Sequence, residues 1–104
     1  MKRSLVLSLA LGLGLSGCAW VSLDPGAESV SVRDADSLAG CERLGKTHTR
    51  TMDSIGFLPR RQSKVEEELV RLARNEAVRM GGNVVSPLSL AVDGEQDFTI
   101  HRCP

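Results

Sequence analysis

The clearest hydrophobic pattern of the chain lies in residues 63–80. Apolar side chains recur there at spacings of three and four, which is the period of an amphipathic α-helix. They are Val65, Leu69, Leu72, Ala73, Ala77 and Met80. Ser63, with Glu66 three residues later, has the form of a capping box, and Gly81 and Gly82 end the pattern. We therefore predict one helix over residues 63–80.

Charged residues occupy the remaining positions of this helix. Glu67 and Arg71 are four residues apart and Glu76 and Arg79 are three apart, which predicts ordinary ion pairs on a solvated face. Glu76 also falls near the middle of the apolar stripe. A catalytic carboxylate is one interpretation, and it requires a second acid, base or metal ligand nearby. We expect the other, in which Glu76 turns out of the core toward Arg79 or an exposed backbone.

Two strand patterns precede the helix. Residues 29–33 alternate apolar and polar types, which predicts a short strand. Residues 41–52 are rich in threonine, which suits a strand with one solvated face, and Gly45 is a candidate bulge. Between this strand and the helix, residues 53–61 contain breakers and predict a loop that is the least ordered part of the domain. Its apolar residues are expected to cover an edge of the core, and they are Ile55, Phe57 and Leu58.

Residues 83–103 predict a hairpin. Apolar residues alternate up to Val92, Asp93-Gly94 follows, and a second run leads to Cys103. An Asp-Gly pair between two such runs is a strong hairpin signal. Pro87 has no N–H to donate, so its strand lies at a sheet edge or is bulged there.

The last strand leaves one question open. Strict alternation places Phe98 and Ile100 on one face and separates His101 and Cys103 from them. A buried Cys103 then requires either that the strand bulges or that Cys103 lies beyond its paired end. Together these patterns predict an α+β fold, with a small antiparallel sheet and a C-terminal hairpin packed on one helix, in a single domain over residues 30–104.

The N-terminus has a different pattern. Lys2 and Arg3 precede an apolar run over residues 5–15, and the small residues after it lead to Cys18. This order predicts a secretory signal peptide over residues 1–17. A transmembrane anchor is the alternative, but spanning hydrocarbon takes about 20 residues, roughly twice this run.

The stretch Leu15-Ser16-Gly17-Cys18 resembles the lipobox of bacterial lipoproteins. The resemblance implies that Cys18 receives a diacylglyceryl group, becomes the first residue after cleavage and is acylated at its amino group. Residues 18–29 would then be a lipidated cysteine and a tether. Ala19 rather than Asp follows the cysteine, which by the same resemblance favours the periplasmic face of the outer membrane.

Composition limits what such a domain can do. Without residues 1–17 the chain has 87 residues, with 11 basic and 13 acidic side chains. This balance gives no field that would draw nucleic acid, so the membrane, through the lipid, and an envelope protein are the partners we expect. Only three aromatic residues remain, which are Trp20, Phe57 and Phe98, so the core is thin and a covalent staple is expected.

The cysteines supply that staple. Three is an odd number for an exported protein, and lipidation of Cys18 leaves Cys41 and Cys103. In an oxidising compartment we expect these two to form a disulfide, and closing a loop of about 60 residues stabilises a fold by roughly 4 kcal/mol on the chain-entropy model.

Enzymatic function is not expected. The chain has no phosphate-binding loop, nucleophile elbow or His-x-x-x-His spacing, and no cofactor beyond the covalent lipid is implied. The alternative is a thiol- or metal-dependent periplasmic protein that uses Cys41 and Cys103 with His48 and His101, and it requires reduced thiols.

Three short motifs carry a resemblance across most of the chain after Cys18. They are Cys41-Glu42-Arg43-Leu44-Gly45, Met80-Gly81-Gly82-Asn83-Val84-Val85 and His101-Arg102-Cys103. With them the chain resembles a family of small bacterial lipoproteins of unknown function. It is similar, more distantly, to the outer-membrane sensor lipoprotein of the Rcs envelope-stress pathway. The resemblance implies a small sheet on one helix, and a binding, envelope-maintenance or stress-sensing role.

Overall fold

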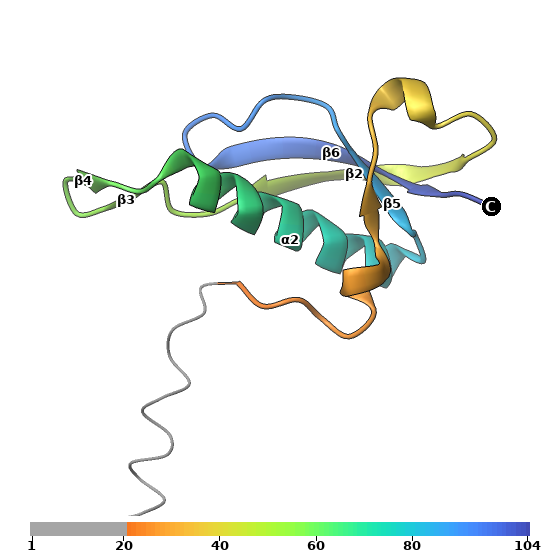
Figure 1. Cartoon of the computed structure of the whole chain (residues 1–104), viewed down its shortest axis with the longest axis horizontal. Coiled ribbons are helices and arrows are strands. Elements are labelled where there is room, and N and C mark those ends of the chain that lie inside the picture. The colour runs from red at the N-terminus through yellow and green to blue at the C-terminus, as the bar shows by residue number, and fades with distance from the viewer. Residues whose placement is uncertain (1–20) are drawn as a thin grey trace, which may run out of the picture.

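The computed structural model describes residues 21–104, in which one long helix packs against one face of a four-stranded sheet (Figure 1). This architecture confirms the predicted α+β class. The predicted signal peptide and Cys18 lie outside the described residues. In chain order the elements are η1 (Ala27–Ser29), β1 (Ser31–Val32), η2 (Ala35–Ser37), β2 (Glu42–Arg50), β3 (Ser54–Ile55), β4 (Leu58–Pro59), α2 (Gln62–Met80), β5 (Val84–Pro87) and β6 (Glu95–Arg102).

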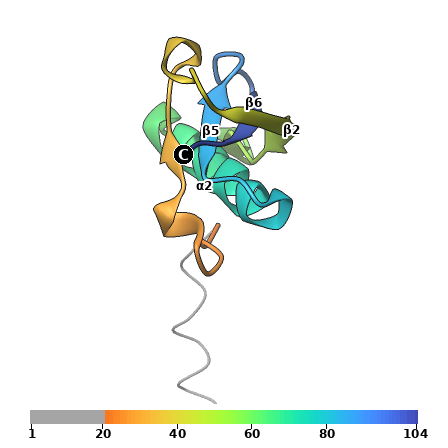
Figure 2. The same ribbon diagram turned by 90° about the vertical axis from the view of Figure 1, so that its right-hand side faces the viewer.

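The sheet has the order β1-β5-β6-β2, and Figure 2 shows its strands side by side with α2 along one face. Strand β6 is antiparallel to both β5 and β2. Strand β1 runs parallel to β5 through the pairs Ser31–Val84 and Val32–Val85. The three longer strands are thus antiparallel, as predicted, and the short β1 makes the sheet mixed. The pattern of a two-residue strand shows which side chains share a face but not which strand it joins or in which direction.

Helix α2 buries its apolar stripe against the sheet. The core joins helix residues to β5, β6 and the segment before β1, through Val65, Leu69, Ala73, Ala77, Val85, Phe98, Ile100 and Val30. Gly81, with a φ of 79°, ends the helix in the left-handed conformation. This end confirms the prediction, because glycine adopts positive φ without a steric penalty.

The start of the helix differs from the prediction. Its N-cap is Arg61, which makes no side-chain cap hydrogen bond, so the capping box of Ser63 and Glu66 is wrong. The backbone explains the difference, because the N–H groups of Lys64 and Val65 both donate to the Arg61 carbonyl. The first turn therefore closes before Ser63 can act as its cap.

The predicted bulge in β2 is confirmed. Arg43 pairs with His101 and Gly45 pairs with Ile100, so Leu44 is the extra residue. A Cβ atom at Gly45 would lie 2.7 Å from the Met80 side chain. Glycine therefore lets β2 pass close to the end of α2 where the bulge bends it.

The Asp93-Gly94 turn is also confirmed. Asp93 and Gly94 have φ values of 51° and 74°, as a two-residue type I′ turn requires. The strand before the turn is shorter than predicted, because β5 ends at Pro87. The apolar residues that follow are exposed, and they are Leu88, Leu90 and Val92. In place of a continuous ladder, the Ser89 hydroxyl accepts a hydrogen bond from the Asp97 N–H.

Strand β5 is an inner strand without a bulge, so the prediction that Pro87 lies in an edge strand or at a bulge is wrong. Strand β1 accompanies β5 only as far as Val85, however, so within residues 21–104 no strand pairs with β5 on that side at Pro87. Its missing N–H therefore breaks no ladder.

Candidate functional site

The two domain cysteines form the disulfide that the sequence predicts. Cys41 and Cys103 are bonded across 62 residues, with their Cα atoms 4.2 Å apart. Strand β6 ends at Arg102, so Cys103 lies just beyond its paired end, which answers the question left open above. Asn83 fixes this end of the chain, because its side chain donates to the Cys103 carbonyl at 2.9 Å and accepts from the Cys103 N–H at 2.8 Å.

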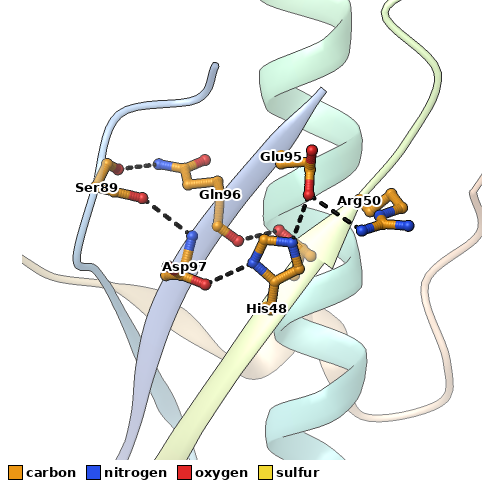
Figure 3. Close-up of polar contacts among 7 residues, drawn as sticks. His48, Arg50, Ser89, Glu95, Gln96 and Asp97 are labelled. Atoms are coloured by element: carbon orange, nitrogen blue, oxygen red, sulfur yellow. Dashed lines mark hydrogen bonds and ion pairs between the residues drawn. The ribbon is translucent and has the colours of Figure 1, made fainter. Parts of the chain in front are cut away.

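A histidine held between two carboxylates lies on the sheet face that points away from α2. The His48 ring meets Asp97 Oδ1 with Nδ1 at 2.7 Å and Glu95 Oε1 with Nε2 at 2.8 Å (Figure 3). Ionised carboxylates only accept hydrogen bonds, so both ring nitrogens must donate. A ring that donates to both carboxylates is an imidazolium, and the hydrogen bond to Asp97, followed by that to Glu95, raises the pKa of His48.

Strand register builds this arrangement. Glu95 and Asp97 are two residues apart on β6 and so share a face, and the pairing of β2 with β6 sets Arg50 opposite Glu95 and His48 opposite Asp97. Arg50 Nη2 lies 3.2 Å from Glu95 Oε1. The His48 hydrogen bond and the Arg50 charge lower the pKa of Glu95. Both His48 nitrogens face carboxylates, so this group ties β2 to β6.

His101 is the second histidine of the chain and has the opposite environment. It is buried, and its Nε2 lies 2.8 Å from the Thr99 hydroxyl. Burial, followed by the charge of Arg43, lowers the pKa of His101. His101 is four residues from Asp97, the partner of His48, which corresponds to about 13 Å along a strand.

The alternative thiol or metal site therefore does not assemble. Its two sulfur atoms are bonded to each other, and its two histidines lie apart on the sheet. Within residues 21–104, no group of three or more histidine, cysteine or acidic side chains is placed to hold a metal ion.

A buried ion pair joins the β3–β4 hairpin to α2. Arg60 makes a bidentate contact with Glu68, with Nη1 2.6 Å from Oε2 and Nη2 3.0 Å from Oε1. The Thr51 hydroxyl also donates to Oε2 at 3.1 Å. The hydrogen bond from Arg60 lowers the pKa of Glu68 although burial opposes it. The sequence prediction missed this pair, because Glu68 resembles the other charged positions of the helix, although its place beside Leu69 on the stripe was a signal.

Residues 53–61, predicted as a loop, contain two short paired strands. Strands β3 and β4 form a small hairpin, in which Ser54 pairs with Pro59 and Ile55 with Leu58. Phe57 at its tip is 94% exposed. The prediction that this segment covers the core is wrong, because β3 and β4 form a separate sheet of their own and leave their apolar side chains outside.

The segment before η1 is bound to the domain. The side chain of Asn75, buried on α2, donates to the Ser22 carbonyl at 2.9 Å and accepts from the Asp24 N–H at 2.8 Å. Arg79 Nη2 lies 3.1 Å from Asp24 Oδ2, and Ala27 in η1 is fully buried. Residues 22–29, which the sequence assigned to the tether, are therefore attached to the domain. A lone asparagine within a helix gave no signal for this contact.

Glu76 has the structural role that we expected. Its carboxylate lies 2.9 Å from Arg79 Nη1, at the rim of a shallow hollow of about 300 Å³ between β2 and α2, lined in part by Thr47 and Leu72. The predicted partner of Glu67 differs, because Glu67 lies 3.5 Å from Lys64 Nζ rather than beside Arg71. Both are ordinary surface pairs.

Within residues 21–104, no helix has the length and apolar content to cross a bilayer.

Comparison with known proteins places the chain in a family without assigning an activity. No curated protein and no solved structure matches it. A family described as "domain of unknown function (DUF4156)" matches residues 21–103, which is most of the chain. The chain therefore belongs to the DUF4156 family.

Proposed function

We propose that this protein is a lipid-anchored protein of the bacterial cell envelope whose domain is a non-enzymatic binding module, with an envelope-maintenance or stress-sensing role. The disulfide between Cys41 and Cys103 carries the proposal. Disulfides persist in oxidising compartments, and this one leaves Cys18, at the end of the apolar run of residues 5–15, as the one cysteine outside a pair.

The lipobox resemblance supplies the anchor. Cleavage before Cys18 and acylation of its thiol and amino group would give three chains. Two lipid signals already anchor a protein stably, because each buried methylene contributes about 0.8 kcal/mol. Ala19 favours the periplasmic face of the outer membrane, and the distant resemblance to the Rcs sensor lipoprotein supports a sensing role.

The side chains that most often perform chemistry are engaged with one another, which supports the non-enzymatic part. Both nitrogens of His48 face carboxylates, and Glu68 is held by Arg60. Cys41 and Cys103 are oxidised. Each of these groups contributes to the fold and would have to leave its partner to act on a substrate.

Acyl labelling of intact cells tests the proposal. Cells that express the full chain should incorporate labelled fatty acid into it, and the C18S variant should not. The C41S/C103S double variant is the matched control, because it loses two cysteines and should keep the label. Label in C18S, or none in the wild type, contradicts the anchor.

Counting reactive thiols tests the disulfide on which the proposal rests. The unreduced mature protein should react with no thiol reagent in its domain, and it should expose two thiols after reduction. Two reactive thiols before reduction would contradict the disulfide and favour the thiol-dependent alternative.

A further inference from the structure

The β3–β4 hairpin gathers the most exposed apolar side chain of the described residues and three neighbours. Phe57 is 94% exposed, Leu58 63%, and Ile55 and Met52 both 52%. Single exposed apolar residues are common on proteins, but several on one projection mark a contact with a partner or a membrane. Figure 1 shows the hairpin projecting from the end of the domain where α2 begins.

The base of the hairpin is fixed, so its tip is held away from the core. The Arg60 N–H donates to the Asp53 carbonyl at 2.8 Å, Arg60 Nη1 donates to the Met52 carbonyl at 2.9 Å, and the same guanidinium holds Glu68. These contacts join both arms of the hairpin to α2. The tip is therefore presented as a projection, and what covers it must come from outside the fold.

The attachment of the N-terminal segment would bring a membrane that holds Cys18 close to this hairpin. Asn75 binds Ser22 and Asp24, and Cys18 lies only four residues before Ser22, a reach of at most about 14 Å. The chain therefore leaves the domain beside the C-terminal half of α2, and an acylated Cys18 would have to lie within that reach. From Asn75 to the start of the helix at Gln62 is about 20 Å along the axis. A bilayer that holds Cys18 and lies along α2 would therefore reach the end of the helix where the hairpin projects.

We propose that the β3–β4 hairpin is a second membrane contact, in which Phe57, with Ile55 and Leu58 beside it, enters the interfacial layer of the bilayer that holds Cys18. This inference rests on the lipid anchor proposed above. Arg61 and Lys64 are exposed at the base of the hairpin, where lipid phosphates would meet Arg61 and would compete with Glu67 for Lys64. Apolar side chains bordered by basic ones are typical of segments that lie in a membrane interface.

A single tryptophan at the hairpin tip tests the contact. Trp20 is the only tryptophan of the chain, so a W20F background gives F57W a unique emission. The mature protein, produced from the full chain, is reconstituted into phosphatidylethanolamine–phosphatidylglycerol vesicles. On vesicles, the indole of F57W should emit at a shorter wavelength than it does in the unfolded protein, where it is exposed to water. Its emission should lose intensity when the vesicles contain brominated lipids.

The matched control is V32W, at a residue 46% exposed on β1, at the other edge of the sheet from β2. Its indole should emit as in water and should be insensitive to brominated lipids. L58W, next to the tip, repeats the measurement if F57W disturbs the hairpin, and it should also be quenched.

Each contrary result has its own meaning. Quenching of F57W no stronger than that of V32W overturns the membrane contact. A shift to shorter wavelength without quenching indicates that a protein or a second copy covers the tip, and it also overturns the proposal. The mass of the purified chain distinguishes failure of the hairpin contact from failure of the lipid anchor. An acylated Cys18 with an unquenched hairpin contradicts the hairpin contact alone. An unacylated Cys18 contradicts the lipid anchor and the hairpin contact together.

Discussion

The side-chain carbonyl of Asn75 accepts a hydrogen bond from the backbone N–H of Asp24 at 2.8 Å, across 51 residues of sequence. This contact, with that from Asn75 to Ser22, determines where the chain leaves the domain. If Cys18 carries the proposed lipid, this contact holds the domain within a short path of the membrane, whereas a free segment over residues 18–29 would let the domain move away.

Asn75→Ala should release this segment. It removes two hydrogen bonds of a buried side chain, and each lost bond costs roughly 0.5–1.5 kcal/mol, so urea unfolding should show a loss of about 1–3 kcal/mol. Hydrogen exchange of the Asp24 amide should become faster. Asn75→Asp is the matched control, because it keeps the acceptor for Asp24 but loses the donor for Ser22, and equal exchange at Asp24 in N75A and wild type would refute the contact.

The pKa values of the two histidines should lie on opposite sides of the ordinary value of 6.5. His48, held by Asp97 and Glu95, should have a raised pKa, and buried His101 a lowered one. The chain has only two histidines, so NMR titration of the ring signals resolves both. In D97N the pKa of His48 should fall while that of His101 stays unchanged.

The same shifts predict how stability depends on pH. A raised pKa in the folded state means that the contribution of His48 is complete below 6.5 and is lost as pH rises through its folded pKa. The lowered pKa of His101 has the opposite sign, so its protonation destabilises the fold as pH falls below 6.5. Unfolding curves of H48Q against wild type should therefore differ most at mildly acidic pH and converge at alkaline pH. A constant difference in the free energy of unfolding across this pH range would contradict the ionic interaction of His48 with Asp97 and Glu95.

Arg60→Met should be strongly destabilising. It leaves the buried Glu68 carboxylate without its cation, and breaking such a pair costs about 3–5 kcal/mol. The R60M/E68M double variant should be more stable than R60M, because it removes the stranded charge as well. Arg61→Met, at the exposed neighbour, is the control and should change stability by no more than about 0.5 kcal/mol.

Acid should also weaken this pair. The pKa of Glu68 lies below its ordinary 4.5, so its contribution is present above 4.5 and is lost as pH falls through the lower folded value. E68Q should remove this acid-sensitive component from the unfolding curve. An unchanged acid profile in E68Q would show that other carboxylates are responsible.

Removing the disulfide should destabilise the domain by roughly 4 kcal/mol, the chain-entropy value for a loop of this length. Urea midpoints of C41S/C103S and of the reduced wild-type protein should agree. A midpoint unaffected by reduction would contradict the predicted staple.

Much of the fold was predictable because its signals are local. The spacing of Leu69 and Ala73 defines the helix, Asp93-Gly94 defines the turn, and the odd cysteine at position 18 leaves Cys41 and Cys103 to pair. Each depends on residues near one another in sequence or on a simple count.

The features that were missed depend on distant contacts. The parallel pairing of β1 with β5 joins Ser31 to Val84, and nothing in either pattern encodes the direction of that pairing. The role of Asn75 depends on Ser22 and Asp24. The partners of His48 were partly predictable from the sequence, since Glu95 and Asp97 alternate on one strand. The register that brings His48 to them, however, is set by the whole sheet.

The position of β6 has a consequence for folding. This strand lies between β5 and β2 in the sheet, yet it follows both of them in the sequence. The sheet therefore cannot close, and the Cys41–Cys103 bond cannot form, until residues 95–103 are available. A shorter chain that stops before β6 would lack both the central strand that joins β5 to β2 and the cysteine that pairs with Cys41.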